Sequence, residues 1–227
     1  MSLIRLFHMA VPGRVHSRAF RCLWVLHELG IKNFEVFMLT PGQAYAPQMR
    51  AQGVRFSTKV PTLLLDGREI GDSGVICQLL AERVEDEINL LGDTHEQLEK
   101  MQWMGFAETC VSLRVPLMPS LMDPNKTLAD IHSEVIEPQR QVFKGNIERF
   151  ETHFREHKRD YLLDSGFSIA DAMCGWGLDK FHSWGLMDLA TGTSPLTLAY
   201  LKRLQSRPAF VRAKQYAELP PGLHNPI

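Results

Sequence analysis

The chain has 227 residues, 44% of them hydrophobic, and its formal net charge is −1. That length and composition allow a sizeable core and exclude global disorder. The low net charge, without any block of Lys or Arg, argues against a nucleic-acid partner, and no apolar window approaches the ~20 residues that cross a bilayer. We therefore expect a cytoplasmic protein that binds neither nucleic acid nor membrane.

The first third of the chain alternates between short strands and helices. Apolar periodicity predicts strands at 3–7, 33–38, 60–65 and 68–70, helices at 17–29 and 73–83, and one short helix inside the loop at 40–59. Gly30 ends the first helix, since glycine accepts the left-handed conformation found after a helix. The Asp66-Gly67 pair predicts a hairpin between the last two strands. This order predicts a small α/β domain whose sheet mixes parallel and antiparallel strands.

The rest of the chain follows a polar, acidic linker at residues 86–95 and is helical throughout. Helices are expected at 96–122, 130–157, 168–184, 196–206 and 208–217. Pro116, Pro119 and Pro138 should kink or end the two longest helices, because proline removes a backbone donor. We therefore predict two domains, an α/β domain at 1–85 and an all-α domain at 96–227.

The cysteines are scattered, with neither a C-x-x-C pair nor the spacing of a zinc site. They are Cys22, Cys77, Cys110 and Cys174. Each lies in an apolar, helix-like context, which is typical of a buried thiol rather than of a nucleophile or a metal ligand. We expect no metal.

Five segments together resemble the cytosolic glutathione transferase superfamily, most of all its serine-type branch in bacteria and fungi. In chain order they read "SRAFRCLWVLHELG", "KVPTLLLDGREIGDSGVICQLL", "MQWMGFAE", "FSIADAMCGWGL" and "YLKRLQSRPAFVRA". None is decisive alone, but their order and spacing match the superfamily over nearly the whole chain. The resemblance implies a thioredoxin-like N-terminal domain with a mixed four-stranded sheet, an all-helical C-terminal domain, glutathione as co-substrate and a homodimer.

The resemblance also implies how Val60 and Pro61 act. Pro61 is expected to follow a cis peptide bond, which outside X-Pro costs ~3 kcal/mol. The bend exposes the backbone N–H and C=O of Val60, which can pair with the cysteinyl backbone of glutathione as an added strand would. Lys59 is placed to contact the glycyl carboxylate. The alternative is a proline that merely begins an edge strand, with Lys59 as a solvated loop residue.

Asp72 and Ser73 begin the helix at 73–83, and two interpretations stay open. Either residue makes an ordinary N-cap, which contributes ~1 kcal/mol. A helix N-terminus also favours an anion. The resemblance implies that Ser73 and the helix N–H groups bind the γ-glutamyl carboxylate of glutathione while Asp72 binds its ammonium group. The superfamily more often has Glu where Asp72 stands. The later pair Ser168 and Asp171 is expected to form a capping box, which is a folding element.

The candidate catalytic residue is Ser17. A thiol with a pKa of ~8.5 is only a few per cent thiolate at neutral pH, so the superfamily holds a Tyr, Ser or Cys between the first strand and the first helix. Ser17 is the one hydroxyl in "HMAVPGRVHSRAF", and Cys22 falls too late in the helix. Ser17 is alternatively the helix N-cap. Arg14 or His16 would stabilise a thiolate by charge instead, and Arg18 adds to the same cluster.

The second substrate is expected to contact apolar side chains of both domains. Those residues are Met9, Val11, Trp103, Phe106, Ala107, Cys110 and Val111. The predicted function is transfer of glutathione to a hydrophobic electrophile, in detoxification or in catabolism, with peroxide reduction or isomerisation as related activities. The alternative is a non-catalytic member of the fold that binds ligands or proteins.

Overall fold

The computed structural model describes residues 4–11, 15–84, 89–111, 128–131, 137, 140–183 and 194–227. The chain divides into two compact units: residues 1–90 with 207–227 form one, and residues 91–206 form the other. The division at Leu90 falls inside the expected linker. Residues 207–227, which the helical pattern assigns to the second domain, belong to the first unit.

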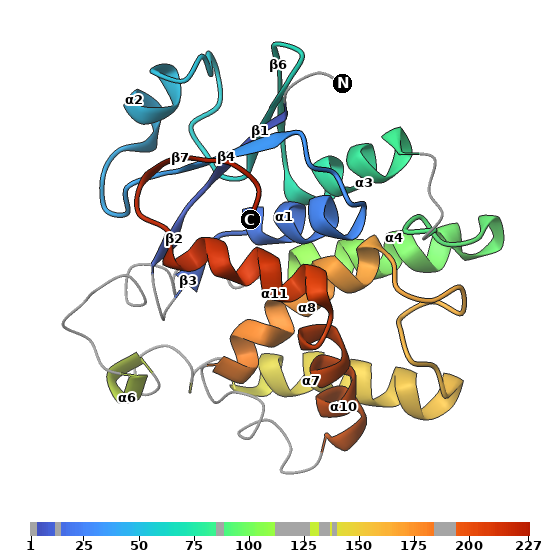
Figure 1. The fold of residues 1–227 in the computed structure, drawn as a ribbon. Coiled ribbons are helices and arrows are strands. Elements are labelled where there is room, and N and C mark those ends of the chain that lie inside the picture. The colour runs from blue at the N-terminus through green and yellow to red at the C-terminus, as the bar shows by residue number, and fades with distance from the viewer. Residues whose placement is uncertain are drawn as a thin grey trace. The chain divides into compact units, whose positions relative to one another are not determined.

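A mixed sheet lies at the centre of the first unit (Figure 1). Among the described residues it has five strands in the order β6-β5-β1-β4-β7. Their bounds are β1 (Ile4–His8), β4 (Phe34–Met38), β5 (Thr62–Leu65), β6 (Arg68–Gly71) and β7 (Gly222–His224). β1 and β4 run parallel, and the other neighbouring strands pair antiparallel. The predicted mixed sheet is confirmed.

The prediction of four strands is wrong, because β7 from the C-terminus adds a fifth. Its residues Gly222, Leu223 and His224 pair with Met38, Phe37 and Val36 of β4. A run this short, with an exposed leucine as its one apolar residue, has no alternating pattern to detect. Long-range pairing rather than local sequence makes it a strand.

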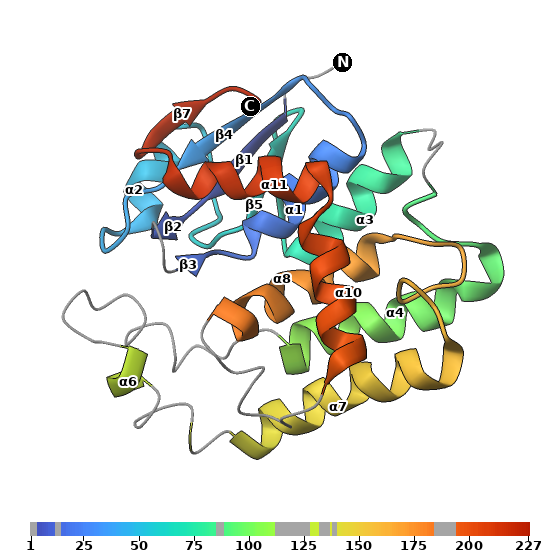
Figure 2. The ribbon, with the colours of Figure 1, turned by 60° about the horizontal axis from the view of Figure 1, so that its bottom comes forward.

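Four α-helices, a small ladder and a 3-10 turn at Tyr216–Glu218 complete the described part of the first unit. They are α1 (Ala19–Glu28), α2 (Tyr45–Arg50), α3 (Ser73–Arg83), α11 (Pro208–Gln215), β2 (Ala10–Val11) and β3 (Val15–His16). Every residue of α1 from Ala19 to His27 is buried. α11 lies beside α1 in both ribbon views (Figures 1 and 2). Its Phe210 ring packs edge-on against Trp24, with centroids 4.9 Å apart, so the C-terminal helix closes the core of this unit.

The second unit is helical in its described parts. Its helices are α4 (Gln97–Phe106), a π-helical turn at Ala107–Val111, α6 (Leu128–Ile131), α7 (Arg140–His157), α8 (Ile169–Ser183) and α10 (Pro195–Gln205), preceded by a 3-10 turn at Thr94–Glu96. α7 is described from Arg140 to His157 and covers the later part of the helix expected at 130–157. Pro116, Pro119 and Pro138, and the kinks expected there, lie outside the described residues.

The capping box at the start of α8 is confirmed. The Ser168 hydroxyl accepts from the N–H of Ala170 at 3.2 Å, and Asp171 Oδ2 accepts from the Ser168 N–H at 2.9 Å. Leu162 N–H and the Tyr200 hydroxyl donate to Asp171 Oδ1 at 3.0 and 2.8 Å. Burial nevertheless raises the pKa of Asp171 to about 6. These bonds tie three segments of the helical unit together.

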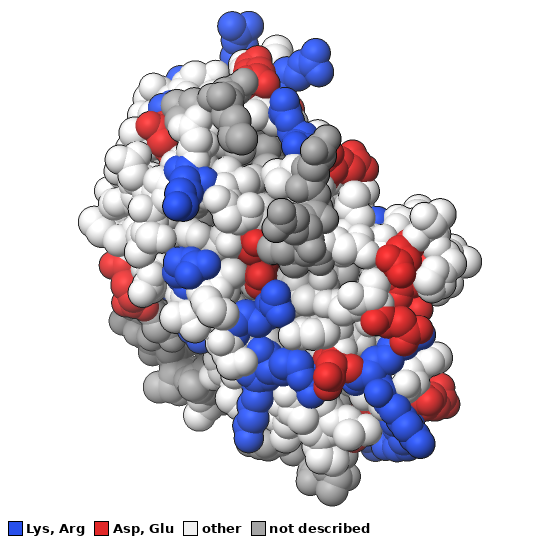
Figure 3. Space-filling model, turned by 45° about the vertical axis from the view of Figure 1, so that its right-hand side comes forward, with Lys and Arg blue, Asp and Glu red and all other residues white. Residues whose placement is uncertain are grey.

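Two features bear on membrane and nucleic-acid partners: the apolar character of the helices and the charge on the surface. None of the described helices combines the length and the apolar character needed to cross a bilayer. On the face drawn in Figure 3, acidic and basic side chains are interspersed. A mixed surface of this kind gives that face no field of a single sign.

Candidate functional site

The strand register brings the predicted site residues to one edge of the sheet. Phe7 of β1 pairs with Thr62 of β5, and Thr62 pairs in turn with Gly71 of β6. The next residue along each strand therefore lies in one row. Those three residues are His8, Pro61 and Asp72. His8 ends β1, Pro61 precedes β5 and Asp72 follows β6, so all three lie at the same end of three adjacent strands.

The Val60-Pro61 peptide bond is cis, as the resemblance implied. Val60 is half-buried, and within the described residues its backbone N–H and C=O form no hydrogen bond. This leaves a donor and an acceptor beside the start of β5. The side chain of Lys59 is exposed. It belongs to the loop before β5, in which the Thr62 hydroxyl donates to the Lys59 carbonyl at 2.7 Å.

Asp72 is the N-cap of α3, so the capping interpretation is confirmed for it. Its Oδ1 accepts from the N–H of Gly74 at 2.9 Å and from the N–H of Val75 at 3.4 Å. Its backbone has φ 69°, a region that Asp and Asn enter more readily than most residues. Both bonds end on Oδ1, and among the described residues no donor reaches Oδ2. Asp72 is exposed, so this second oxygen can accept from a ligand.

Ser73 is the first residue of α3 and is buried with 1% of its surface exposed. Its hydroxyl oxygen accepts from Nη1 of Arg21 at 3.0 Å. Arg21 comes from α1 and is fully buried. Because Asp72 makes the cap, the Ser73 side chain is not needed for it. The residue proposed for carboxylate binding is instead linked to a buried cation.

Ser17 lies in the short turn between β3 and α1. Its hydroxyl oxygen is 2.9 Å from Nδ1 of His8, and both side chains are buried. The same oxygen accepts from the N–H groups of Met9 and Ala19 at 3.4 and 3.3 Å. The N-cap position of α1 belongs to Arg18, whose side chain makes no capping hydrogen bond. Ser17 therefore has two backbone donors and one imidazole around a single hydroxyl.

The alternatives that would stabilise a thiolate by charge come from the same segment as Ser17. Arg14 lies outside the described residues, and Arg18 is exposed. His16 is buried, with its ring nearly parallel to that of His8 at a centroid distance of 6.3 Å. The His16 ring also lies 5.1 Å from the ring of Phe20. His8, His16 and Ser17 therefore form one buried polar cluster at the edge of the sheet.

The residues expected to meet the second substrate are divided between the units. In the first unit Met9 is buried and Val11 half-buried. In the second unit Trp103, Phe106 and Ala107 are buried. Cys110 and Val111 lie on the π-helical turn, and their side chains fall outside the described part. Because these residues are divided between the two units, the proposed pocket for the second substrate remains a prediction.

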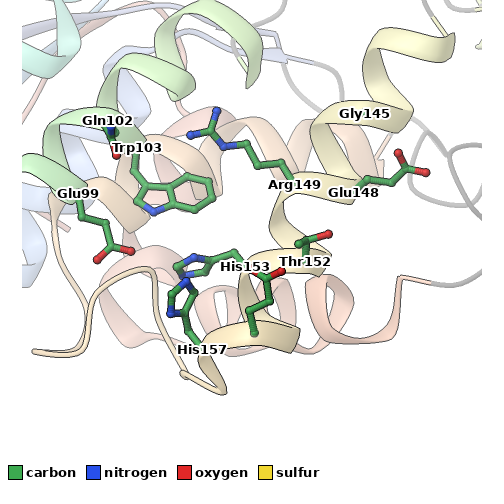
Figure 4. A pocket seen from close by; sticks show the side chains of 10 residues that line it. Glu99, Gln102, Trp103, Gly145, Glu148, Arg149, Thr152, His153 and His157 are labelled. Carbon is green, nitrogen blue, oxygen red and sulfur yellow. The ribbon is translucent and has the colours of Figure 1, made fainter.

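Trp103 and Phe106 pack inside the helical unit, against α7. Trp103 stacks on Phe150 with ring centroids 5.2 Å apart, and the Arg149 guanidinium lies 4.3 Å from the ring centroid of Phe106. Trp103 also lines an open groove of about 440 Å³ between α4 and α7 (Figure 4). Burial and the neighbouring His157 lower the pKa of His153, in the same groove, to about 4. These two aromatic residues therefore contribute to the core of the helical unit.

Three cysteines are buried thiols, as predicted: Cys22, Cys77 and Cys174. Burial and the neighbouring Cys77 raise the pKa of Cys22 well above its ordinary value. A thiol that stays protonated is a poor nucleophile. The side chain of Cys110 lies outside the described part.

His8 and Arg21 also lie at the candidate site, although the sequence patterns did not single them out. His8 carries a weak signal, as a histidine at the end of a predicted strand beside the Ser17 loop. Arg21 falls on the apolar periodicity of the first helix, where an arginine is unusual. Their partners, Ser17 and Ser73, are 9 and 52 positions away in the chain. Only the fold brings each pair together.

Comparison with known proteins gives one family match and many similar structures. Residues 17–87 match the family model described as glutathione S-transferase, N-terminal domain. No curated protein matches the chain by sequence. A glutathione S-transferase from Xylella fastidiosa has a TM-score of 0.74 at 20% identity, over 96% of this chain and 100% of that chain.

Two further structures agree. A glutathione transferase from Methylococcus capsulatus has a TM-score of 0.67 at 22% identity, over 96% of this chain and 100% of that chain. One from Methylobacillus flagellatus, solved with glutathione bound, has a TM-score of 0.66 at 19% identity, over 92% of this chain and 98% of that one. The chain thus has the glutathione transferase fold, and the predicted thioredoxin-like domain followed by a helical region is confirmed. The serine-type branch stays a prediction.

Proposed function

We propose that the protein is a cytoplasmic glutathione transferase that acts on a hydrophobic electrophile. Its residues 17–87 match the family model of the glutathione S-transferase N-terminal domain. The observation that carries the proposal is the register Phe7–Thr62–Gly71 across three strands. It gathers the free backbone groups of Val60, the exposed carboxylate of Asp72 and the buried hydroxyl of Ser73 beside one sheet edge. A scaffold without a ligand has no need for that combination.

Glutathione is an extended peptide whose backbone groups match this edge. Its cysteinyl N–H and C=O would pair with the C=O and N–H of Val60, as an added strand does. Oδ2 of Asp72 would accept from the γ-glutamyl ammonium group. Ser73 would donate to the γ-glutamyl carboxylate, and the exposed Lys59 would meet the glycyl carboxylate. The glutathione-bound relative from Methylobacillus flagellatus supports glutathione as the co-substrate.

The chemical step needs the sulfur as a thiolate. The S–H proton leaves to solvent, and the hydroxyl of Ser17 donates a hydrogen bond to the anion that remains. The sulfur electron pair then forms the new bond to an electrophilic carbon, whose leaving group departs with its bonding pair. His8, 2.9 Å from the same hydroxyl, holds Ser17 in place for this task. The apolar residues expected at the second substrate suit a hydrophobic electrophile.

We also infer a homodimer, with α3 and α4 contributing to its interface. Large apolar side chains are exposed on both helices: Val75 is 55% exposed on α3, and Leu98 and Met101 are 69% and 65% exposed on α4. Exposed apolar side chains on neighbouring helical turns are typical of surfaces that another protein covers.

One experiment tests the function directly. The purified chain is passed over immobilised glutathione, and the eluted protein is assayed for conjugation of glutathione to an aromatic halide. We expect retention and turnover, both lost when soluble S-alkyl glutathione competes. Retention without turnover on a broad electrophile panel that includes hydroperoxides would favour the non-catalytic alternative. A chain that is not retained at all would sink the proposal.

A further inference from the structure

The loop that leads to Val60 is bound by a carboxylate of the neighbouring hairpin. Glu69 lies in β6, and its Oε1 accepts from the N–H of Arg55. Its Oε2 accepts from the N–H groups of Phe56 and Ser57 at 3.0 and 2.9 Å. Three successive backbone donors thus surround one carboxylate, as in loops that bind anions. Desolvation opposes ionisation of Glu69, but these hydrogen bonds outweigh it and lower the pKa of the carboxyl.

Arg50, at the end of α2, binds the other side of the same loop. Its Nη1 donates to the carbonyl oxygens of Val54 and Ser57 at 3.2 and 3.1 Å. Residues 54–61 lie outside helices and strands, so no ladder fixes their backbone. Glu69 takes N–H groups of this segment while Arg50 takes carbonyl groups, and together they replace the pairing that a helix or strand would give.

Two hydroxyl groups extend this restraint to Lys59, the residue before Val60. The Thr62 hydroxyl donates to the Lys59 carbonyl at 2.7 Å. Because that hydrogen is used, Ser57 is the donor in the 2.5 Å contact between the Ser57 and Thr62 hydroxyls. Ser57 therefore connects the two anchors, since Glu69 binds its N–H and Thr62 binds its side chain. The position of Lys59 and Val60 depends on this chain of contacts.

We propose that Glu69 is a positioning residue for the cysteinyl part of glutathione: by binding three N–H groups of the loop, it directs the backbone N–H and C=O of Val60 toward the peptide. This inference rests on the proposed function. Within the described residues the backbone groups of Val60 form no hydrogen bond, so the loop that carries them sets their direction. Glu69 also lies three residues before Asp72, so one short segment would set both the cysteinyl and the γ-glutamyl contacts.

The rival explanation is that Glu69 only stabilises the hairpin. Arg55 and Phe56 are exposed, so water competes for two of the three hydrogen bonds, and their contribution to stability is small. A role in stability alone would make unfolding easier and leave the affinity of the folded protein unchanged. Positioning would weaken glutathione binding, and most of all for ligands whose cysteinyl N–H is present to meet the Val60 carbonyl.

The experiment compares S-methylglutathione with its depsipeptide analogue, in which an ester oxygen replaces the cysteinyl N–H. Calorimetry measures both affinities for the unmodified protein and for Glu69→Gln. The unmodified protein should bind the depsipeptide about 10-fold more weakly, because one hydrogen bond to Val60 is lost. Glu69→Gln should weaken S-methylglutathione about 10-fold but the depsipeptide only about threefold or less, since both changes then act on the same contact.

Asp66→Asn is the matched control, because it makes the same change from carboxylate to amide at the turn of the same hairpin. Asp66 pairs only loosely with Arg83, at 3.6 Å, and asparagine tolerates its positive φ. Both affinities should stay unchanged in this variant. In assays of turnover, Glu69→Gln should raise KM for glutathione about 10-fold and leave kcat within about twofold, as expected when only binding is weakened.

Full affinity of Glu69→Gln for S-methylglutathione, or equal weakening of both ligands, would overturn the inference and leave the transferase proposal standing. So would equal affinities of the unmodified protein for the two ligands, or equal losses in Glu69→Gln and Asp66→Asn. If Glu69→Gln does not fold, Ser57→Ala breaks the same chain of contacts at Thr62 and carries the same comparison. An unmodified protein that binds neither ligand would overturn the proposed function and this inference together.

Discussion

The Nδ1 atom of His8 lies 2.9 Å from the hydroxyl oxygen of Ser17, and both side chains are buried. The two residues stand at opposite ends of the connection between β1 and α1, so their contact closes that connection beside the sheet edge. Backbone N–H groups of Met9 and Ala19 donate to the same oxygen. Ser17 is therefore held by three neighbours, which fixes the position from which its hydroxyl would meet a sulfur atom.

Replacing Ser17 by alanine should lower turnover more than glutathione affinity. If the hydroxyl donates to the thiolate, its loss removes a hydrogen bond to a charged group, about 1.5–3 kcal/mol. Turnover at pH 7 should then fall roughly 10- to 100-fold, with a raised pKa for the bound thiol. Affinity should change little, since the proposed site assigns most of the binding to Val60, Asp72 and Ser73. Titration of the thiolate absorbance of bound glutathione measures this pKa.

His8→Phe and Arg14→Ala are the companions of that variant. If His8→Phe lowers turnover in the unmodified protein but causes no further loss in the Ser17→Ala variant, His8 acts through Ser17. If instead Arg14→Ala raises the pKa of the bound thiol and Ser17→Ala does not, Ser17 is not catalytic and is only a buried contact of His8.

Asp72→Asn should weaken glutathione binding without weakening the fold. Asparagine caps helices about as well as aspartate and tolerates positive φ, so the bonds to Gly74 and Val75 can persist. The negative charge for the γ-glutamyl ammonium group is lost, and affinity should fall about 10-fold or more. Asp72→Gly is the matched control. Glycine adopts the positive φ without strain, but it cannot accept the capping hydrogen bonds from Gly74 and Val75. Equal affinity in Asp72→Asn and the unmodified protein would end the assigned role.

The hairpin at 60–71 and α3 show what local pattern can predict. A turn pair between two apolar runs and a polar cap before a helical period are local signals, and the predicted helix at 73–83 is confirmed to the residue. β7 has no such signal, because its pairing with β4 joins two segments that lie far apart in the chain. The same is true of Arg21: periodicity places it inside α1, but only the packing of α1 on α3 aims it at Ser73.

The predicted dimer should be sensitive to charge on α4. Light scattering after size exclusion should give about twice the chain mass for the unmodified protein. Met101→Asp places a carboxylate in the proposed interface, where burial of an unpaired charge is costly, and should yield a monomer at micromolar concentration. Val211→Asp is the control, since Val211 is also 49% exposed but lies on α11. A monomeric unmodified protein, or dissociation by both variants alike, would count against this interface.

The ion pair between Glu28 and Arg207 should hold the C-terminal segment on the first unit. Nε and Nη2 of Arg207 donate to the two carboxylate oxygens of Glu28 at 2.6 and 2.9 Å, and Trp24 Nε1 donates at 2.8 Å. Glu28→Gln removes the negative charge that pairs with this half-buried guanidinium, and should cost about 2 kcal/mol of unfolding free energy. Urea denaturation measures this value. Lys144→Ala breaks the exposed i,i+4 pair with Glu148 and should cost less than about 0.5 kcal/mol.

His27 should make the first unit less stable as the pH falls below neutrality. Burial, and then the charge of Arg212, lower its pKa from 6.5 to about 4. Between these values the unfolded state binds a proton that the folded state does not, so unfolding free energy rises with pH. The contribution is complete above pH 6.5 and is lost as the pH falls through 4. From pH 7 to pH 5 the loss should be about 2 kcal/mol.

His27→Phe tests this, because phenylalanine keeps the aromatic contacts with Phe34 and Tyr216 but takes up no proton. The difference in unfolding free energy between pH 7 and pH 5 should shrink in this variant by about 2 kcal/mol. Arg212→Ala removes a charge that lowers the pKa of His27, so the ring should titrate at higher pH by NMR. A ring that titrates near 6.5 in the unmodified protein, or an unchanged pH dependence in His27→Phe, would show that burial of His27 is not coupled to stability.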